Sequence, residues 1–90
     1  LPRTAELFQN YPNPFNPVTT ISYALSTDGQ VELGVYNLNG QLVRSLVNEN
    51  QAEGNHKIEF NADDLTSGLY IYELKVDGKS VQSRKLILMK

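Results

Sequence analysis

Few side chains in this sequence have the chemistry of a catalytic site. The chain has a single histidine, the residue type most often used as a general base, and this His56 alternates with Ile58 and Phe60 as in a β-strand. A serine nucleophile would also need a sharp turn and an acid that orients the histidine, and the sequence contains no such local motif. We therefore interpret His56 as a packed or rim imidazole and predict that the chain is not an enzyme.

Asp63 and Asp64, with Asn61 nearby, carry oxygen atoms of the kind that calcium prefers, because this cation binds several oxygens that converge from a loop. Their spacing matches no established calcium-binding loop. The same residues are also typical of a turn in which one aspartate caps the backbone and Leu65 packs into the core. Both interpretations stay open, and we assign no metal ligand and predict no cofactor.

Phe8, Tyr11 and Phe15 alternate with prolines near the start of the chain. All four prolines lie within residues 1–17, where they deny backbone donors to a β-ladder and favour extended or turned geometry. The three aromatic rings could form a contact platform for a sugar or a partner. Alternatively, they anchor this segment to the rest of the domain by burying apolar area.

The composition restricts the remaining functions. The chain has 90 residues, no cysteine, and eight basic against ten acidic side chains, for a net charge of −2. A chain of this length closes one modest core, and without cysteine it forms no disulfide or cysteine-based zinc site. The basic residues form no stripe, so we expect no nucleic-acid partner. The longest apolar run, Leu86–Met89, is far shorter than the roughly 20 residues of a membrane helix, so we expect no membrane insertion.

Strand patterns dominate the chain from residue 19 onward. In residues 19–25, Ile21, Tyr23 and Leu25 fall on one face, which predicts a strand with one buried side. Similar runs follow at nearly regular spacing, separated by turn signals, as in antiparallel sandwiches. The predicted strands are Glu6–Gln9, Thr19–Leu25, a run through Val31–Val35, Gln41–Val47, a run through His56–Phe60, a run through Tyr70–Val76, and Lys79–Met89.

Two dipeptides predict tight hairpins, because asparagine or aspartate followed by glycine favours the positive φ angles of a type I′ turn. These are Asn39-Gly40 and Asp77-Gly78. The longer loop of residues 63–68 is long enough to cross between sheets. We therefore predict two sheets of three or four strands packed face to face. The predicted core includes Leu33, Val35, Phe60, Tyr70 and Tyr72.

The last predicted strand differs from the others because residues 86–89 are apolar on both faces. Either both sides are covered within the domain, or one side receives a partner by strand addition. The second interpretation includes an edge-strand dimer of two copies of this chain.

Many positions also match a known family. The segment FQNYPNPFNP at residues 8–17, followed by TISYAL at 20–25, closely resembles the opening of the C-terminal sorting domains of the bacterial type IX secretion system, also called the Por secretion system. The resemblance covers residues 7–90, and the immunoglobulin-like domain of the flagellar hook-capping protein shares much of the pattern. Later matches are Val35-Tyr36-Asn37, Gly40, Gly68-Leu69-Tyr70, Gly78, Lys85-Leu86 and Lys90.

The resemblance implies an all-β fold, an immunoglobulin-like β-sandwich of about seven antiparallel strands with a proline-rich extended N-terminal segment. Residues 7–90 would form a sorting domain at the end of a secreted enzyme or adhesin, and residues 1–6 would be a linker remnant from this longer parent protein. The N-terminal passenger would cross the periplasm and then an outer-membrane translocon, to reach the cell surface or be secreted. A sortase would cleave at or before residues 1–6.

The family also implies which positions the secretion machinery recognises. Gly68 and Gly78 suit turns with positive φ, whereas Lys85 and Lys90 flank the apolar end strand and could meet an acidic receptor. The free carboxylate of Lys90 would be part of the signal. The predicted sorting residues are Gly68, Tyr70, Gly78, Lys85, Leu86 and Lys90.

Two functions of other classes stay open. One is an accessory module that binds carbohydrate or a cell surface through Phe8, Tyr11 and Phe15. The other is a passive spacer. Truncation of such a spacer would change neither the location of the parent protein nor its binding to a partner.

Overall fold

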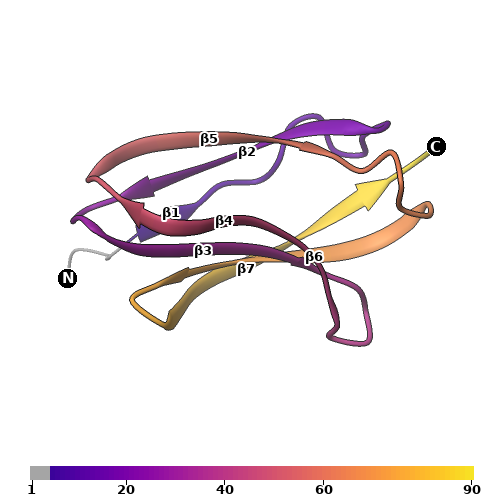
Figure 1. The fold of residues 1–90 in the computed structure, drawn as a ribbon. Helices are drawn as coiled ribbons and strands as arrows, with labels where there is room; N and C mark the ends of the chain where they lie inside the picture. Colours follow the sequence, from indigo (N-terminus) through magenta and orange to yellow (C-terminus); the bar gives the residue numbers. More distant parts are fainter. Residues whose placement is uncertain (1–4) are drawn as a thin grey trace.

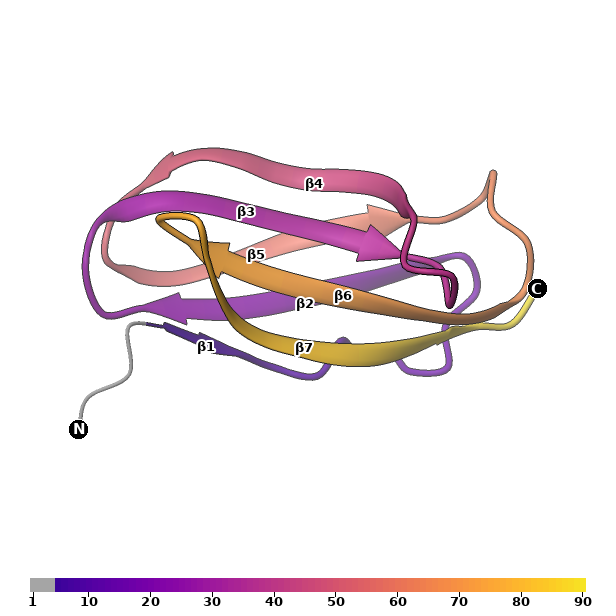
Figure 2. The same ribbon diagram turned by 90° about the horizontal axis from the view of Figure 1, so that it is seen from below.

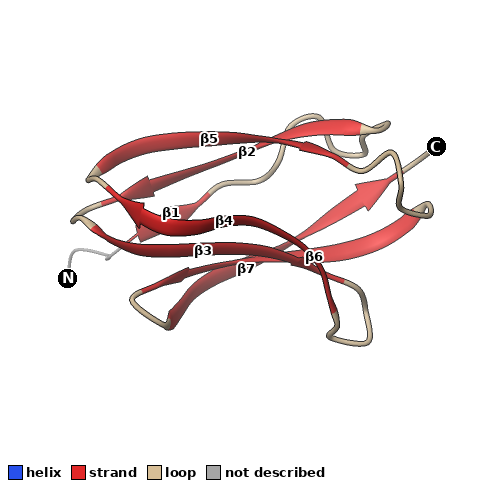
Figure 3. Cartoon of the chain, viewed as in Figure 1, coloured by secondary structure: helices blue, strands red, loops and turns tan. Residues whose placement is uncertain are grey.

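Residues 5–90, the part of the chain that this computed structural model describes, form two antiparallel sheets packed face to face (Figure 1). One sheet has three strands in the order β1-β2-β5, and the other has four in the order β4-β3-β6-β7. The strands are β1 (Ala5–Leu7), β2 (Val18–Leu25), β3 (Gly29–Tyr36), β4 (Leu42–Gln51), β5 (Gly54–Asn61), β6 (Gly68–Val76) and β7 (Lys79–Leu88). Strands and loops account for all of these residues (Figure 3). The predicted seven-stranded sandwich is confirmed.

The core lies between the two sheets, where alternate side chains of each strand meet. All five predicted core residues are buried: Leu33, Val35, Phe60, Tyr70 and Tyr72. The alternation predicted for residues 19–25 is also confirmed, since Ile21, Tyr23 and Leu25 are buried in β2. Each such side chain contributes about 1.5–3 kcal/mol by leaving water.

The family resemblance predicts that the boundary between linker and domain follows residue 6. In the structure Ala5 and Glu6 already pair with β2, opposite Leu25 and Ala24. Residues 1–4, which carry most of the predicted linker and cleavage region, lie outside the described residues.

The β6–β7 hairpin has the predicted turn. Asp77 and Gly78 have φ values of 52° and 80°, and Val76 pairs with Lys79 across them. Positive φ at both central residues defines the type I′ turn.

The predicted type I′ turn at Asn39-Gly40 is wrong. Gly40 has a positive φ of 82°, but Asn39 does not, and the loop has three residues rather than two. The Gly40 N–H donates to the Asn37 carbonyl at 3.0 Å, while the Asn37 N–H donates to the Gln41 carbonyl at 3.0 Å. The Asn37 side-chain oxygen also accepts from the backbone of Asn39 and Gln41, at 3.0 Å each. This side chain stabilises the longer loop, which a dipeptide signal does not take into account.

The proline-rich segment is bent and non-helical, which agrees with the predicted extended or turned geometry, and a buried polar network holds it. Its Tyr11-Pro12, Asn13-Pro14 and Asn16-Pro17 bonds are cis. The Tyr72 hydroxyl donates to the Phe8 carbonyl and accepts from the Asn10 N–H, both at 2.8 Å. The buried Asn10 side chain donates to Thr19 Oγ1 at 3.0 Å. The motif around Asn10 therefore joins β2 to β6.

The same segment covers the outer edge of β7 near its end. The Phe15 N–H donates to the Ile87 carbonyl at 3.0 Å, and the Met89 N–H donates to the Phe15 carbonyl at 2.9 Å. The Asn13 side chain accepts from the Ile87 N–H at 2.9 Å. The terminal strand is therefore only partly covered within the domain. Its edge is bonded to Phe15 and Asn13 and its inner face is buried, but Ile87 and Met89 on the outer side remain exposed. Dimerisation through another edge stays a prediction.

β1 and β7 lie side by side although they belong to different sheets (Figure 2). The Leu7 N–H donates to Gln82 Oε1 at 3.1 Å, and Arg84 Nε donates to the Leu7 carbonyl at 2.8 Å. These side chains close this side of the sandwich and place the last strand beside the first.

Candidate functional site

Five of the six predicted sorting residues lie toward one end of the β6–β7 pair. Gly68 and Tyr70 begin β6 and face Leu88 and Leu86 across the ladder. Lys85 precedes Leu86, and Lys90 follows the strand. Gly78 is not part of this group, because it forms the turn at the opposite end of the ten-residue strand β7.

Two of these residues point inward. Tyr70 and Leu86 are buried in the core, and the Tyr70 hydroxyl donates to the Thr66 carbonyl at 2.7 Å. Their side chains therefore shape the end of the sandwich from inside, whereas Gly68, Lys85 and Lys90 are exposed.

Lys90 is held by the loop between β5 and β6. Its backbone N–H donates to Ser67 Oγ at 3.0 Å, and its Nζ donates to the Asp63 carbonyl. Lys85 is also held through its backbone, because its carbonyl accepts from Gln9 Nε2 at 2.8 Å. The end of the chain is thereby ordered against a loop and against the N-terminal segment.

An ion pair between Arg44 and Asp64 ties the β5–β6 loop to β4. Arg44 Nη2 donates to both carboxylate oxygens of Asp64, at 2.6 and 2.8 Å, and these hydrogen bonds lower the pKa of this carboxyl. The Arg44 guanidinium also lies 5.8 Å from the centre of the Phe60 ring. Within residues 5–90 no three metal-binding side chains gather into a group. The side chain that caps the turn in the β5–β6 loop is Asn61, whose Oδ1 accepts from the Asp63 N–H at 2.9 Å, rather than an aspartate. Leu65 packs against the core, as the turn interpretation predicts.

The three aromatic residues of the proline-rich segment do not form one surface. Phe15 is only 2% exposed and lies 6.0 Å from Phe60, so it anchors the segment. Phe8 and Tyr11 lie beside β2, where their backbone N–H groups donate to Ser22 and Thr20, and their side chains are exposed.

His56 lies at the rim, as predicted. Its ring stacks on Tyr23 with centres 5.3 Å apart, and its Nε2 is 2.8 Å from the Ala52 carbonyl. Burial raises the pKa of the Tyr23 hydroxyl, which also donates to Gln51. These contacts give the His56 side chain a structural role at the rim of the sandwich.

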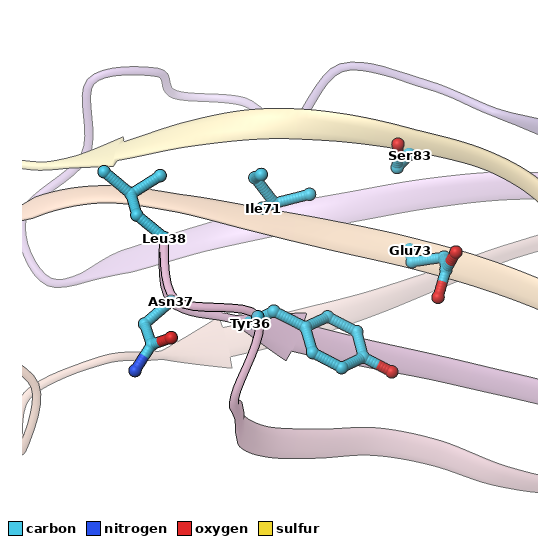
Figure 4. Close-up of a pocket in the computed structure, with 7 residues that line it drawn as sticks. Tyr36, Asn37, Leu38, Ile71, Glu73 and Ser83 are labelled. Atoms are coloured by element: carbon cyan, nitrogen blue, oxygen red, sulfur yellow. The ribbon is translucent and has the colours of Figure 1, made fainter.

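Sequence reasoning missed an apolar hollow on the outer face of the four-stranded sheet. It measures about 250 Å³, and Figure 4 shows the Leu38, Tyr36 and Ile71 side chains around it, with Glu73 and Ser83 beside them. A signal for this hollow is present in the sequence: two strands carry apolar residues at outward positions. An antiparallel sheet that faces water usually carries polar residues at such positions.

Comparison with solved structures defines the class of fold. The chain is similar to dimeric latent PorU from Porphyromonas gingivalis, with 20% identity and a TM-score of 0.79, over 99% of this chain and 10% of that one. It is also similar to an immunoglobulin-like protein from Pseudomonas aeruginosa, with 10% identity and a TM-score of 0.58, over 99% and 93% of the two chains. A third similar structure is a β-glucosidase from Listeria innocua, with 9% identity and a TM-score of 0.61, over 96% and 16%. The domain is an immunoglobulin-like β-sandwich.

The family follows from the sequence match. Residues 9–89 match the family described as the secretion system C-terminal sorting domain, so the chain belongs to this family of type IX sorting domains. A search of curated proteins found no match. The chain spans about a tenth of the PorU chain to which it is similar.

Membership of this family shows a role as a secretion signal. Sorting domains of this type are non-catalytic, and they act with an N-terminal passenger and with secretion machinery that exports the passenger to the cell surface or beyond. Residues 5–90 contain no helix that could cross a membrane.

Proposed function

We propose that this domain directs its passenger from the periplasm through the type IX outer-membrane translocon, and that the translocon recognises the end of the sandwich formed by β6, β7 and the β5–β6 loop. The observation that carries this proposal is the ordering of Lys90, which is hydrogen-bonded to Ser67 and Asp63. An ordered segment loses less conformational entropy on binding than a flexible one.

The six sorting residues have different roles in this proposal. Gly68, Lys85 and Lys90 are exposed and make direct contact with the receptor. Tyr70 and Leu86 are positioning residues, because their buried side chains support the strands that carry the lysines. Gly78 acts through the hairpin turn, away from the receptor.

We place the sortase cleavage before Ala5. Cleavage needs an accessible, extended backbone, and Ala5 is already paired with Leu25 and buried. The domain would then leave the mature passenger at the cell surface.

A reporter fused ahead of residue 1 tests the sorting role in a bacterium that has the type IX system. We expect the intact fusion at the cell surface and a fusion lacking residues 86–90 in the periplasm. Because that deletion also removes buried leucines, a Lys90→Glu variant is measured beside it, with Lys57→Glu on the exposed face of β5 as the matched control. Unchanged export after the deletion would favour a passive spacer and refute the sorting role.

The exposure of Phe8 and Tyr11 favours a second candidate function, an accessory module that binds a polysaccharide. The buried Phe15 does not contribute to it. Affinity electrophoresis of the wild type and of Tyr11→Ser in gels containing polysaccharides tests this candidate. Equal mobility in every gel would exclude it.

A further inference from the structure

The outer face of the four-stranded sheet carries a set of apolar side chains that the core does not use. The pairs Tyr36–Ile71 and Leu69–Ile87 are adjacent across the strands. Leu38 lies in the β3–β4 turn, and Leu42 begins β4. Leu38 is 64% exposed and Leu42 is 56% exposed. We call this set the outer apolar patch; its members are Tyr36, Leu38, Leu42, Leu69, Ile71 and Ile87.

A glycine allows this patch to lie flat on the sheet. Gly34 faces outward between the core residues Leu33 and Val35. A Cβ atom at Gly34 would lie 2.9 Å from Leu42 Cδ1 and 3.3 Å from Tyr36 Cε1, both closer than ordinary contact. The missing side chain therefore lets the leucine and the tyrosine ring cover the strand, so the patch is formed before any partner binds.

The charge beside the patch is unbalanced. Lys85 is exposed and lies opposite Ile71 across the β6–β7 ladder, and among residues 5–90 it makes no ion pair. The nearby Glu73 is already engaged, by Lys75 at 3.9 Å and by Ser80 Oγ at 2.8 Å. The free charge next to the apolar surface is therefore positive.

We infer that the outer apolar patch is a docking surface for a protein of the secretion machinery, which places apolar side chains on the patch and a carboxylate against Lys85. This inference rests on the proposed sorting function and deepens it. A second copy of the chain fits less well, because a two-fold contact would bring two Lys85 side chains into one interface while Glu73 stays paired. The patch also continues the surface that carries Lys85, so one partner would cover both.

The test compares export of the reporter fusion with and without the patch. In Leu38→Ser/Ile87→Ser, two exposed side chains change while the backbone bonds of Ile87 remain. Burial of one leucine is worth about tenfold or more in affinity, so we expect the surface fraction to fall about tenfold or more. Tyr11→Ser is the matched control, because Tyr11 is an exposed aromatic residue beside the other sheet. The fusion that carries Tyr11→Ser should be exported as efficiently as the wild-type fusion.

The charge is tested separately. Lys85→Glu should lower export more than Lys85→Gln, because it places a second negative charge against the partner's carboxylate. Lys57→Glu, an exposed lysine on β5, should have no effect. Equal export by Lys85→Glu and the wild type would overturn the assignment of an acidic partner. All purified variants should unfold within a few degrees of the wild type, which excludes loss of fold.

The outcomes distinguish this inference from the function on which it rests. If the wild-type fusion stays in the periplasm, the sorting function fails and the docking surface fails with it. If the wild type and the patch variant are exported equally, the docking surface alone is wrong. A wild-type dimer in sedimentation that Leu38→Ser/Ile87→Ser dissociates would assign the patch to a second copy. Binding to anionic phosphatidylglycerol vesicles that the same variant loses would assign it to a lipid surface, and either result overturns the inference.

Discussion

Replacing Tyr72 by phenylalanine tests the claim that one buried hydroxyl joins the proline-rich segment to the sandwich. Tyr72 is fully buried, and its hydroxyl bonds both the Phe8 carbonyl and the Asn10 N–H at 2.8 Å. The ring remains in Tyr72→Phe, so the variant removes hydrogen bonds and little packing.

The expected cost follows from the two groups that lose their partner. The Asn10 N–H belongs to a residue with 2% exposure, and an unsatisfied buried donor costs about 1–3 kcal/mol. The Phe8 carbonyl belongs to an exposed residue, so water replaces part of its bond. We expect a loss of about 2–3 kcal/mol in the free energy of unfolding, which lowers the Tm of a domain of this size by about 10–20 °C.

Urea unfolding followed by far-UV circular dichroism measures this loss through the transition midpoint at constant slope. The control is Tyr11→Phe, because Tyr11 is 81% exposed and its change should stay within about 0.5 kcal/mol. If Tyr72→Phe also stays within about 0.5 kcal/mol of the wild type, the hydroxyl does not hold the segment and the reasoning is wrong.

Three further predictions concern pH, a turn and an edge. Burial raises the pKa of Tyr23 and Tyr72 above 10.0, so the folded protein keeps these phenol protons after the unfolded chain has lost them. The free energy of unfolding should therefore fall as pH rises above about 10, and less steeply in Tyr72→Phe, whereas a flat urea midpoint from pH 9 to 11 would contradict this. Gly78→Ala should lower the free energy of unfolding by about 1–2 kcal/mol in the same urea assay, because φ at this position is 80° and alanine is strained there. If Gly78→Ala lowers it no more than the neighbouring exposed Lys79→Ala does, backbone strain at the turn is excluded. Asn13→Ala should speed hydrogen exchange at the Ile87 amide but not at Leu86, and equal protection would show that the side chain does not cover this edge.

Local patterns in the sequence determined most of the secondary structure. The alternation of apolar residues predicted β2, because neighbouring side chains of a strand point to opposite faces. Asp77-Gly78 predicted its turn because both residues adopt positive φ at low cost. The same reasoning failed at Asn39-Gly40, where the side chain of Asn37 stabilises a longer loop.

The family motif could be recognised in the sequence, but its physical purpose could not. Asn10 has the appearance of a loop residue, yet it is buried against Tyr72, 62 positions along the chain. Phe15 and Tyr11 looked equivalent, and the fold buries one and exposes the other.

The strands, the core residues and the sorting family can be predicted from the amino-acid order, because side-chain periodicity, turn chemistry and motif order are properties of neighbouring residues. The folded domain was needed to show that the proline-rich segment covers the edge of β7, that Lys90 is held by Ser67, and that Ile71 and Lys85 lie together on an outer surface. Each of these contacts joins residues from separate strands or loops. The contact between Phe15 and β7 depends on tertiary packing. The pairing of Ile71 with Lys85 depends on the register shift between Leu74 and Lys75. Local patterns along the chain specify neither.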